Sequence, residues 1–217
     1  MAMNRQRWLL WTATAALLVA AVAAGRRWVD ARHDVWATAG PELQTVLWPV
    51  PRPLARFRMR TQYGDVYTAE QMRGQWSFVY FGYLSCPDAC PTTLQTLHEF
   101  RRALLVADPA AERDRFIFVD VDPGHDDSNR VAAYLAYFDP QFLGLTGAPD
   151  QLAALAGSMG VAYAEHVDSQ GVRSMDHSTS VLLVAPDGRV VGAFPAPIEP
   201  ARMLRLFQQL RRHSPGG

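Results

Sequence analysis

Lysine is absent from this chain, and all 21 of its basic residues are arginine. The 21 acidic residues balance them, so the formal net charge at pH 7 is zero. A protein that binds nucleic acid needs a surplus of positive charge gathered on one face. Because the charge here is balanced, we expect no nucleic-acid partner.

Cysteine is almost as scarce, with two residues in a chain of 217, and both lie in the stretch FGYLSCPDACP. Cys86 and Cys90 are four positions apart, so a disulfide between them would close a very small loop and add little stability. The spacing therefore disfavours a structural disulfide. A redox-active pair and a pair of metal ligands both stay open on the spacing alone.

Long apolar runs are limited to the N-terminal region, where Leu9 to Gly25 reads LLWTATAALLVAAVAAG without a charge. Its length is at the short end of the roughly 17–25 residues that span a bilayer. Tryptophans at positions 8, 11 and 28 fit the interfacial ends of such a helix. We expect a cytoplasmic stub and an uncleaved membrane anchor over residues 1–27. A cleaved signal peptide is the alternative, and both would export the remainder.

Three further segments complete the expected organisation. Residues 28–53 show weak periodicity and end in WPVPRP, whose prolines favour an extended connection, so a periplasmic spacer is predicted. Residues 54–213 are predicted to form a single domain, because apolar strands and amphipathic helices alternate there. Residues 214–217 are expected to be a short tail.

Short apolar runs predict the strands of this domain. Four of them suit buried strands, at residues 76–82, 115–121, 179–185 and 189–194. Helices are predicted from Pro91 onward and over residues 129–138, 150–159 and 199–211, with Ser128 as the N-cap of the second. The predicted fold class is α/β: a central mixed, mostly parallel sheet flanked by helices, with the cysteine loop at the C-terminal end of the first strand.

The element order and four motifs resemble a known family. The motifs are FGYLSCPDACP, FVDVDPGHDD, LAYFDPQFLGLTG and DHSTSVLLVAPDGRVV. Over residues 57–209 the chain is similar to the Sco/SenC family of membrane-anchored copper chaperones, which serve the assembly of cytochrome c oxidase. The resemblance implies a thioredoxin-like fold, copper as Cu(I), Cu(II) or both, and a reversible redox disulfide between Cys86 and Cys90.

His177 is the best candidate for a third metal ligand. It stands in MDHSTS, directly before a predicted strand, on the segment that the resemblance places beside the cysteine loop. Two thiolates and one imidazole make a soft site that suits Cu(I), can hold Cu(II) and also attracts Zn(II). Thiolate is expected because a helix N-terminus favours that form. We therefore predict a copper site formed by Cys86, Cys90 and His177.

Four other residues are candidates for contacts around the metal or with a partner: Asp88, Asp122, His125 and Asp176. Carboxylates at strand and helix ends often only cap the element or face solvent. The chain departs from the family at His125, where an arginine is usual in the Asp-Pro turn, and just before Asp176, where an aromatic residue is usual. Met175 is expected to pack in the core or to act as a weak thioether near copper.

The resemblance implies that the function is delivery of copper to the cytochrome c oxidase subunit that carries the binuclear copper centre. The chain would be a single-pass protein of the bacterial inner membrane with its domain facing the periplasm. Delivery by ligand exchange needs no enzymatic turnover, so the chain is not expected to be an enzyme. A periplasmic copper donor and a thioredoxin-like reductant are further expected partners.

The main alternative is a periplasmic thiol–disulfide oxidoreductase that reduces the cysteines of the copper acceptor. Such enzymes normally have two residues between their cysteines, whereas three intervene here. They also carry a proline before the strand that faces the active site, and residues 175–180 contain none. A redox-sensing module, whose cysteine state alters a membrane partner, is a third class.

Overall fold

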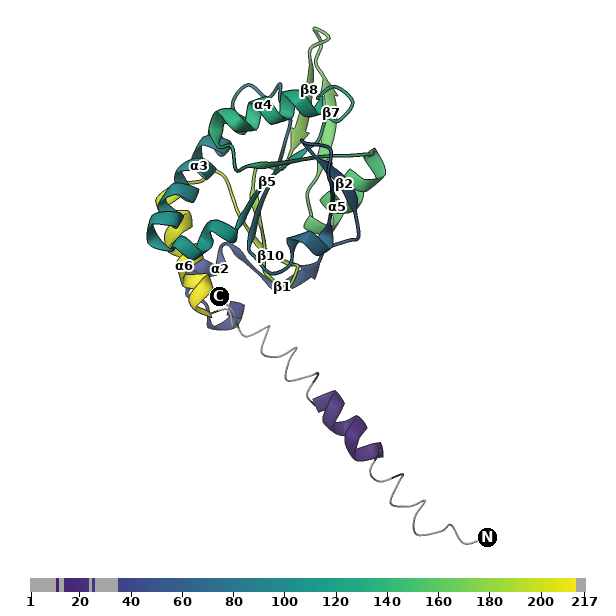
Figure 1. The fold of residues 1–217 in the computed structure, drawn as a ribbon, viewed down its shortest axis with the longest axis vertical. Coiled ribbons are helices and arrows are strands. Elements are labelled where there is room, and N and C mark those ends of the chain that lie inside the picture. The colour runs from purple at the N-terminus through teal and green to yellow at the C-terminus, as the bar shows by residue number, and fades with distance from the viewer. Residues whose placement is uncertain (1–10, 12–13, 24, 26–34, 214–217) are drawn as a thin grey trace, which may run out of the picture.

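A sheet of eight strands runs through the centre of the domain in the computed structural model, which describes residues 11, 14–23, 25 and 35–213 (Figure 1). In spatial order the strands are β1 (Leu47–Pro53), β10 (Arg189–Phe194), β9 (Val181–Val184), β4 (Ser77–Gly82), β5 (Arg115–Asp120), β6 (Leu143–Thr146), β2 (Arg58–Thr61) and β3 (Val66–Thr68). The four strands predicted from apolar runs are β4, β5, β9 and β10. All four are confirmed.

The sheet is mixed, but it is not mostly parallel as the sequence led us to expect. Only β4 with β5 and β5 with β6 pair in parallel, and the other neighbours in the sheet are antiparallel. The inference of parallel pairing from alternating strands and helices was correct only for the central strands β4, β5 and β6. The hairpins β2–β3 and β9–β10 add antiparallel strands on both sides, because short turns can join only antiparallel neighbours.

Helices cover both faces of the sheet. The longer helices are α3 (Ala89–Ala107), α4 (Ser128–Phe138), α5 (Pro149–Met159) and α6 (Pro200–His213), and short ones span Pro41–Gln44 (α2), Ala69–Met72 and Pro109–Arg113. Helices α3 and α6 pack together on one face, whereas α5 lies against β1 and β2 (Figure 1). The predicted helices are confirmed, but the N-cap of α4 is Asp127 rather than Ser128, and its carboxylate accepts from two backbone N–H groups.

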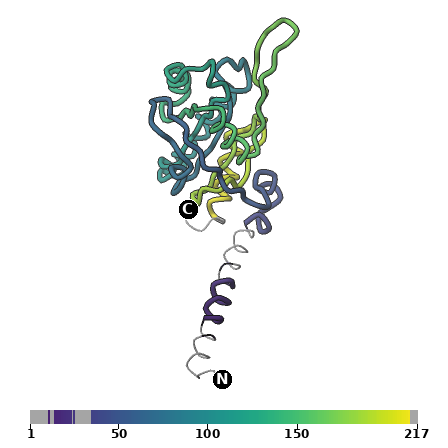
Figure 2. The backbone as a smooth tube through the Cα atoms, turned by 90° about the vertical axis from the view of Figure 1, so that its right-hand side faces the viewer, coloured from purple at the N-terminus to yellow at the C-terminus, as the bar shows by residue number. Residues whose placement is uncertain are grey.

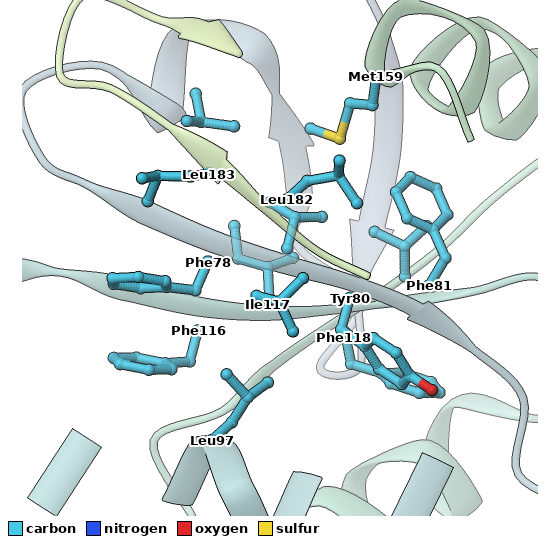
Figure 3. Packing of buried hydrophobic residues seen from close by; sticks show 14 of the residues in the cluster. Phe78, Tyr80, Phe81, Leu97, Phe116, Ile117, Phe118, Met159, Leu182 and Leu183 are labelled. Carbon is cyan, nitrogen blue, oxygen red and sulfur yellow. The ribbon is translucent and has the colours of Figure 1, made fainter. Parts of the chain in front are cut away.

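The core is built around β4, whose six residues are all buried. Phe78 and Tyr80 point to the face of the sheet where Leu97 of α3 packs, and Phe81 points to the opposite face (Figure 3). The Phe78 ring lies 4.9 Å from the ring of Phe100 on α3, measured between centroids. A strand covered on both faces reads as an uninterrupted apolar run, which is why the sequence alone identified it.

Residues expected to belong to a spacer form part of the sheet instead. Strand β1 contains Pro49, Pro51 and Pro53, and it pairs antiparallel with β10 at the edge of the sheet. Proline cannot donate to a ladder, so it is tolerated at an edge where one side of the strand needs no partner. The folded unit therefore begins before residue 54.

A separate two-stranded sheet projects from the domain. Its strands, β7 (Tyr163–Val167) and β8 (Arg173–His177), pair antiparallel with each other. Both views show the hairpin standing away from the main body (Figures 1 and 2). The second strand ends at the candidate ligand His177.

The predicted anchor, Leu9 to Gly25, lies only partly within the described residues. Residues 11, 14–23 and 25 are helical. Among the described residues, no helix combines the length and the apolar character that crossing a bilayer requires.

Candidate metal centre

The cysteine loop follows β4 at the edge where the parallel strands β4 and β5 end together. Gly82 and Asp120 are paired at this edge. Cys86 lies in the loop, and Cys90 lies in the first turn of α3. Cys90 packs so closely against the end of β4 that a Cβ atom on Gly82 would lie 2.8 Å from Cys90 Sγ. Glycine at position 82 thus makes room for the sulfur.

Three potential ligands converge at this edge. The Sγ atoms of Cys86 and Cys90 and a ring nitrogen of His177 all lie within 4.8 Å of one another, and both cysteines are free thiols. Cys90 Sγ lies 3.6 Å from His177 Nε2. The predicted ligand set is therefore assembled in one place, from the cysteine loop, α3 and β8. Among the described residues, no other cluster of three or more histidine, cysteine or carboxylate side chains lies close enough together to hold a metal ion.

The His177 ring is oriented to offer its Nε2 lone pair. Its Nδ1 lies 3.1 Å from the carbonyl oxygen of Ser178. A carbonyl can only accept, so Nδ1 carries the proton in the neutral ring and Nε2 is left as the electron-pair donor toward Cys90. The rings of Tyr80 and Tyr83 stand edge-on to the imidazole, each with a centroid distance of 5.9 Å. These contacts restrict rotation of the ring.

The two thiols differ in environment. Cys90 is fully buried, whereas Cys86 is partly exposed. Burial raises the pKa of the Cys90 thiol to about 12. In the absence of metal, loss of solvation thus favours the protonated thiol at Cys90 over the thiolate expected at a helix N-terminus. The backbone N–H of Cys90, in the first turn of α3, donates to Cys86 Sγ over 3.4 Å.

Two sulfurs and one imidazole nitrogen fit a soft metal ion. Such a donor set suits Cu(I), and the nitrogen makes Cu(II) acceptable as well. A metal ion binds cysteine as the thiolate, so occupancy of the site requires Cys90 to lose its proton. The Tyr80 hydroxyl donates to Cys90 Sγ over 3.6 Å, and this contact can stabilise the negative charge on the sulfur.

The group of potential ligands includes none of the four additional candidates. Asp122 is buried, accepts from His125 Nδ1 at 2.9 Å, and is paired with Arg173. The hydrogen bonds from Arg173 hold the pKa of Asp122 below its ordinary value. Asp88 and Asp176 are exposed, and Asp88 precedes α3 without a side-chain capping bond.

Met175 packs in the core, and its sulfur lies 3.7 Å from Arg173 Nη2. Its packing role is therefore the one that the structure supports. Sequence reasoning missed Arg173, Tyr80 and Asp126, of which the last accepts from the backbone N–H of Leu84 in the cysteine loop at 2.8 Å. A signal existed for Arg173, because residues two and four positions before His177 share its face of a strand.

The comparison with protein families matches the SCO1/SenC family to residues 51–211. A candidate copper-binding protein of Stutzerimonas stutzeri is 30% identical over 171 residues, which cover 78% of this chain and 82% of that protein. The mitochondrial SCO2 homolog of Bos taurus is 37% identical over 133 residues, which cover 61% of this chain and only 50% of that protein. The chain thus spans about half of this mitochondrial relative.

A solved structure shows the same fold. The ScoI protein of Bradyrhizobium japonicum, determined with copper bound, is 31% identical and superposes with a TM-score of 0.65 over 75% of this chain and 99% of that one. This agreement confirms the predicted thioredoxin-like fold in its Sco form. Because the family match extends over most of the domain, from residue 51 to residue 211, the chain belongs to the SCO1/SenC family.

Proposed function

We propose that this chain is a copper chaperone that binds one copper ion through Cys86, Cys90 and His177 and passes it to another protein. The observation that carries the proposal is the convergence of the three ligand atoms within 4.8 Å, with no disulfide between the sulfurs. Copper supplies a charge that displaces the Cys90 proton, and the His177 ring is already oriented to donate. Little rearrangement is needed to close the site.

The relatives support copper as the metal. The Bradyrhizobium japonicum protein was solved with copper bound, and the Stutzerimonas stutzeri relative is named for copper binding. At equal access, the Irving–Williams order also favours Cu(II) over Zn(II) at such donors. Both arguments point to the same ion.

Transfer would proceed by ligand exchange. Cys86 is the partly exposed sulfur, whereas Cys90 is buried beneath it. An acceptor thiolate would therefore displace Cys86 first, form a shared intermediate, and then replace Cys90 and His177 in turn. Besides the bonds to copper only S–H bonds change, because each released cysteine takes up a proton and each acceptor cysteine gives one up. The acceptor that the family resemblance indicates is the cytochrome c oxidase subunit with the binuclear copper centre.

The location that fits this role is the bacterial inner membrane, with the domain in the periplasm. Support comes from the N-terminal segment, where Leu17, Leu18 and Val19 lie on a helix and are each about two-thirds exposed (70%, 67% and 69%). Apolar side chains gathered on an exposed helix favour insertion into lipid over contact with water. An anchored domain would meet an oxidase subunit in the same membrane.

One observation favours a second function. A partly exposed Cys86 beside a buried Cys90 resembles the pairing of an attacking and a resolving thiol. In that role Cys86 thiolate attacks the acceptor's disulfide, a mixed disulfide forms, and Cys90 then releases the reduced acceptor while the chain's own disulfide is formed. The chain loses two electrons and the acceptor gains them. His177 takes no part in these thiol–disulfide exchange steps.

Transfer separates the two functions. The copper-loaded full chain is mixed with a metal-free, reduced binuclear-copper domain, and copper on each protein is measured after separation. The chaperone proposal expects copper to move and expects Cys86→Ser to abolish both loading and transfer. Absence of transfer, together with reduction of an oxidised acceptor by the metal-free chain and by His177→Ala alike, would favour the oxidoreductase.

A further inference from the structure

Three alternate residues of strand β8 face the main body, and each makes a different kind of contact. Residues 173, 175 and 177 share one face of the strand because side chains alternate with a period of two. On that face lie Arg173 with its ion pair, the buried Met175 and the ligand His177. The intervening Asp176 is exposed. The ligand is thus the last of three residues that look toward the main body.

This strand is not held by a backbone ladder of the main sheet. Among the described strands, β7 and β8 pair only with each other. Contacts from side chains must therefore fix β8 against the edge where the cysteine loop lies. Such contacts come from all three inward residues: Arg173 reaches Asp122, Met175 packs in the core, and the His177 ring lies edge-on to Tyr80 and Tyr83.

Among these contacts, the Arg173–Asp122 ion pair has the most restrictive geometry. Arg173 Nη1 and Nη2 each lie 2.6 Å from a different carboxylate oxygen of Asp122, so the pair is bidentate. Bidentate pairs of this kind fix orientation as well as distance. The Asp122 side chain is 7% exposed and the Arg173 side chain 27%, so solvent screens the pair only in part.

Asp122 is itself anchored to the main sheet. Its backbone N–H donates to Asp120 Oδ1 at 2.9 Å, directly after β5. His125 Nδ1 occupies the remaining space on Asp122 Oδ1 from the solvent side. The ion pair therefore connects β8 to the end of β5, next to the end of β4 where the cysteine loop begins.

We propose that Arg173, through its bidentate contact with Asp122, is the positioning residue that holds His177 within reach of the copper bound by Cys86 and Cys90. The inference rests on the proposed function, because it concerns how this site keeps its nitrogen ligand. Arg173 touches no metal ligand. It acts by keeping β8, the hairpin strand that carries His177, against the sheet edge.

The affinities for Cu(I) and for Cu(II) should respond differently when the Arg173–Asp122 contact is lost. Both thiols come from the cysteine loop and α3, which Arg173 does not contact. Cu(I) is satisfied by two thiolates, whereas Cu(II) depends more on the nitrogen. Arg173→Gln is therefore expected to weaken Cu(II) binding about 10- to 100-fold, the range typical of residues that orient a metal ligand, and to leave Cu(I) binding within about twofold.

The chain offers a matched control. Arg101 on α3 also pairs with a buried aspartate, Asp139, over 3.1 Å, and the two side chains are 16% and 4% exposed. Arg101→Gln removes another ion pair with a buried aspartate, and this pair includes none of the three ligands. It should reduce stability in a similar way and leave the Cu(II) absorption spectrum unchanged. Arg173→Lys keeps the charge but not the bidentate contact, so it should restore only part of the Cu(II) affinity.

A double-mutant cycle tests the positioning role directly. Full-length parent, Arg173→Gln, His177→Ala and the double variant are titrated with Cu(II) and with Cu(I). If Arg173 acts through His177, Arg173→Gln has no further effect on Cu(II) affinity once His177 is absent. In the metal-free protein, hydrogen exchange of the β8 amides should be faster in Arg173→Gln than in the parent, with β9 unchanged.

The outcomes separate this inference from the proposed function. Failure of the parent to bind copper would overturn the proposed function and the inference with it. Copper binding by the parent, with Arg173→Gln indistinguishable from it in Cu(II) affinity and in β8 exchange, would overturn the inference alone. Equal loss of Cu(I) and Cu(II), or an equal effect of Arg173→Gln with and without His177, would likewise show that Arg173 does not act on the histidine.

Discussion

Cys90 Sγ lies 3.6 Å from His177 Nε2, although 87 positions separate the two residues in the chain. The cysteine is held by the first turn of α3 and the histidine by the end of a projecting hairpin. Neither element could bring its ligand to the other without the sheet edge between them. The metal centre is therefore a product of the tertiary fold, and changes that leave all three ligands intact should still alter it.

Gly82→Ala is expected to disturb the metal site by crowding Cys90. The added Cβ would lie 2.8 Å from both Cys90 Sγ and a ring carbon of Phe118, and both neighbours are buried in the core. We expect a loss of about 1–3 kcal/mol in the free energy of unfolding, measured by urea denaturation, and weaker Cu(I) binding. Gly124→Ala is the control, because nothing lies within 4 Å of that position. Parental copper affinity and stability in Gly82→Ala would contradict the packing argument.

Tyr80→Phe should destabilise the Cys90 thiolate without changing the shape of the site. The lost hydroxyl donates to Cys90 Sγ, and hydrogen bonds to charged groups contribute about 1.5–3 kcal/mol. We expect Cu(I) affinity to fall about tenfold or more and the Cu(II)–thiolate absorption band to shift.

Tyr134→Phe provides the matched control for that experiment. Tyr134 also contacts Phe118, but its buried hydroxyl has no hydrogen-bond partner among the residues that the structure describes. Its removal should leave copper binding unchanged. If Tyr134→Phe and Tyr80→Phe gave the same affinity and the same spectrum, the hydrogen bond to Cys90 would have no role in binding.

Oxidation should switch copper binding off. Cys86 and Cys90 are free and close enough to form a disulfide after a small movement. Oxidised glutathione would accept their two electrons, and both thiolate donors would be lost together. We expect the oxidised full chain to bind neither copper ion, and reduction by dithiothreitol to restore binding. Retention of copper by the oxidised form would mean that the sulfurs are not the ligands.

The sequence was sufficient for the ligands and for the central strands. Cys86, Cys90 and His177 stand in short, distinctive motifs, and β4 and β5 are continuous apolar runs that only a doubly covered strand explains. Local pattern and tertiary environment agree at these positions. Such agreement is what makes a prediction from sequence succeed.

The remaining features depend on contacts between segments that are distant in sequence. Strand β1 was read as a spacer because prolines dominate it, and only its pairing with β10 makes it a strand. The pKa of Cys90 was expected to fall at a helix start, but burial under β4 raises it. Arg173 was passed over because its partner, Asp122, lies 51 positions away.

Asp120→Asn should change how stability depends on pH. Burial raises the pKa of Asp120 to about 7 in the folded chain, against about 4 in the unfolded chain. The contribution of Asp120 to stability is therefore fully present below pH of about 4 and is lost as the pH rises through about 7. Asparagine does not titrate, so the stability of Asp120→Asn relative to the parent should increase by up to about 1.4 kcal/mol per pH unit across this window.

The measurement is urea unfolding of both proteins at several pH values from 4 to 8. Asp114→Asn is a comparison at a second buried carboxyl, whose pKa is raised to about 6 by burial, so its relative gain should end at a lower pH. A relative stability of Asp120→Asn that is constant with pH, or that falls as the pH rises, would contradict the buried-carboxyl account.

The most direct test of the account is a titration of the full-length, reduced protein with Cu(I) and with Cu(II), in parallel with Cys86→Ser, Cys90→Ser, His177→Ala and His125→Ala. We predict one copper ion per parent chain and nearly complete loss of both ions in either cysteine variant. We also predict partial loss of Cu(I) and a larger loss of Cu(II) in His177→Ala, and parental binding in His125→Ala. Parental Cu(II) binding by His177→Ala, with loss in His125→Ala, would show that the turn after β5 supplies the third ligand and would contradict the site described here.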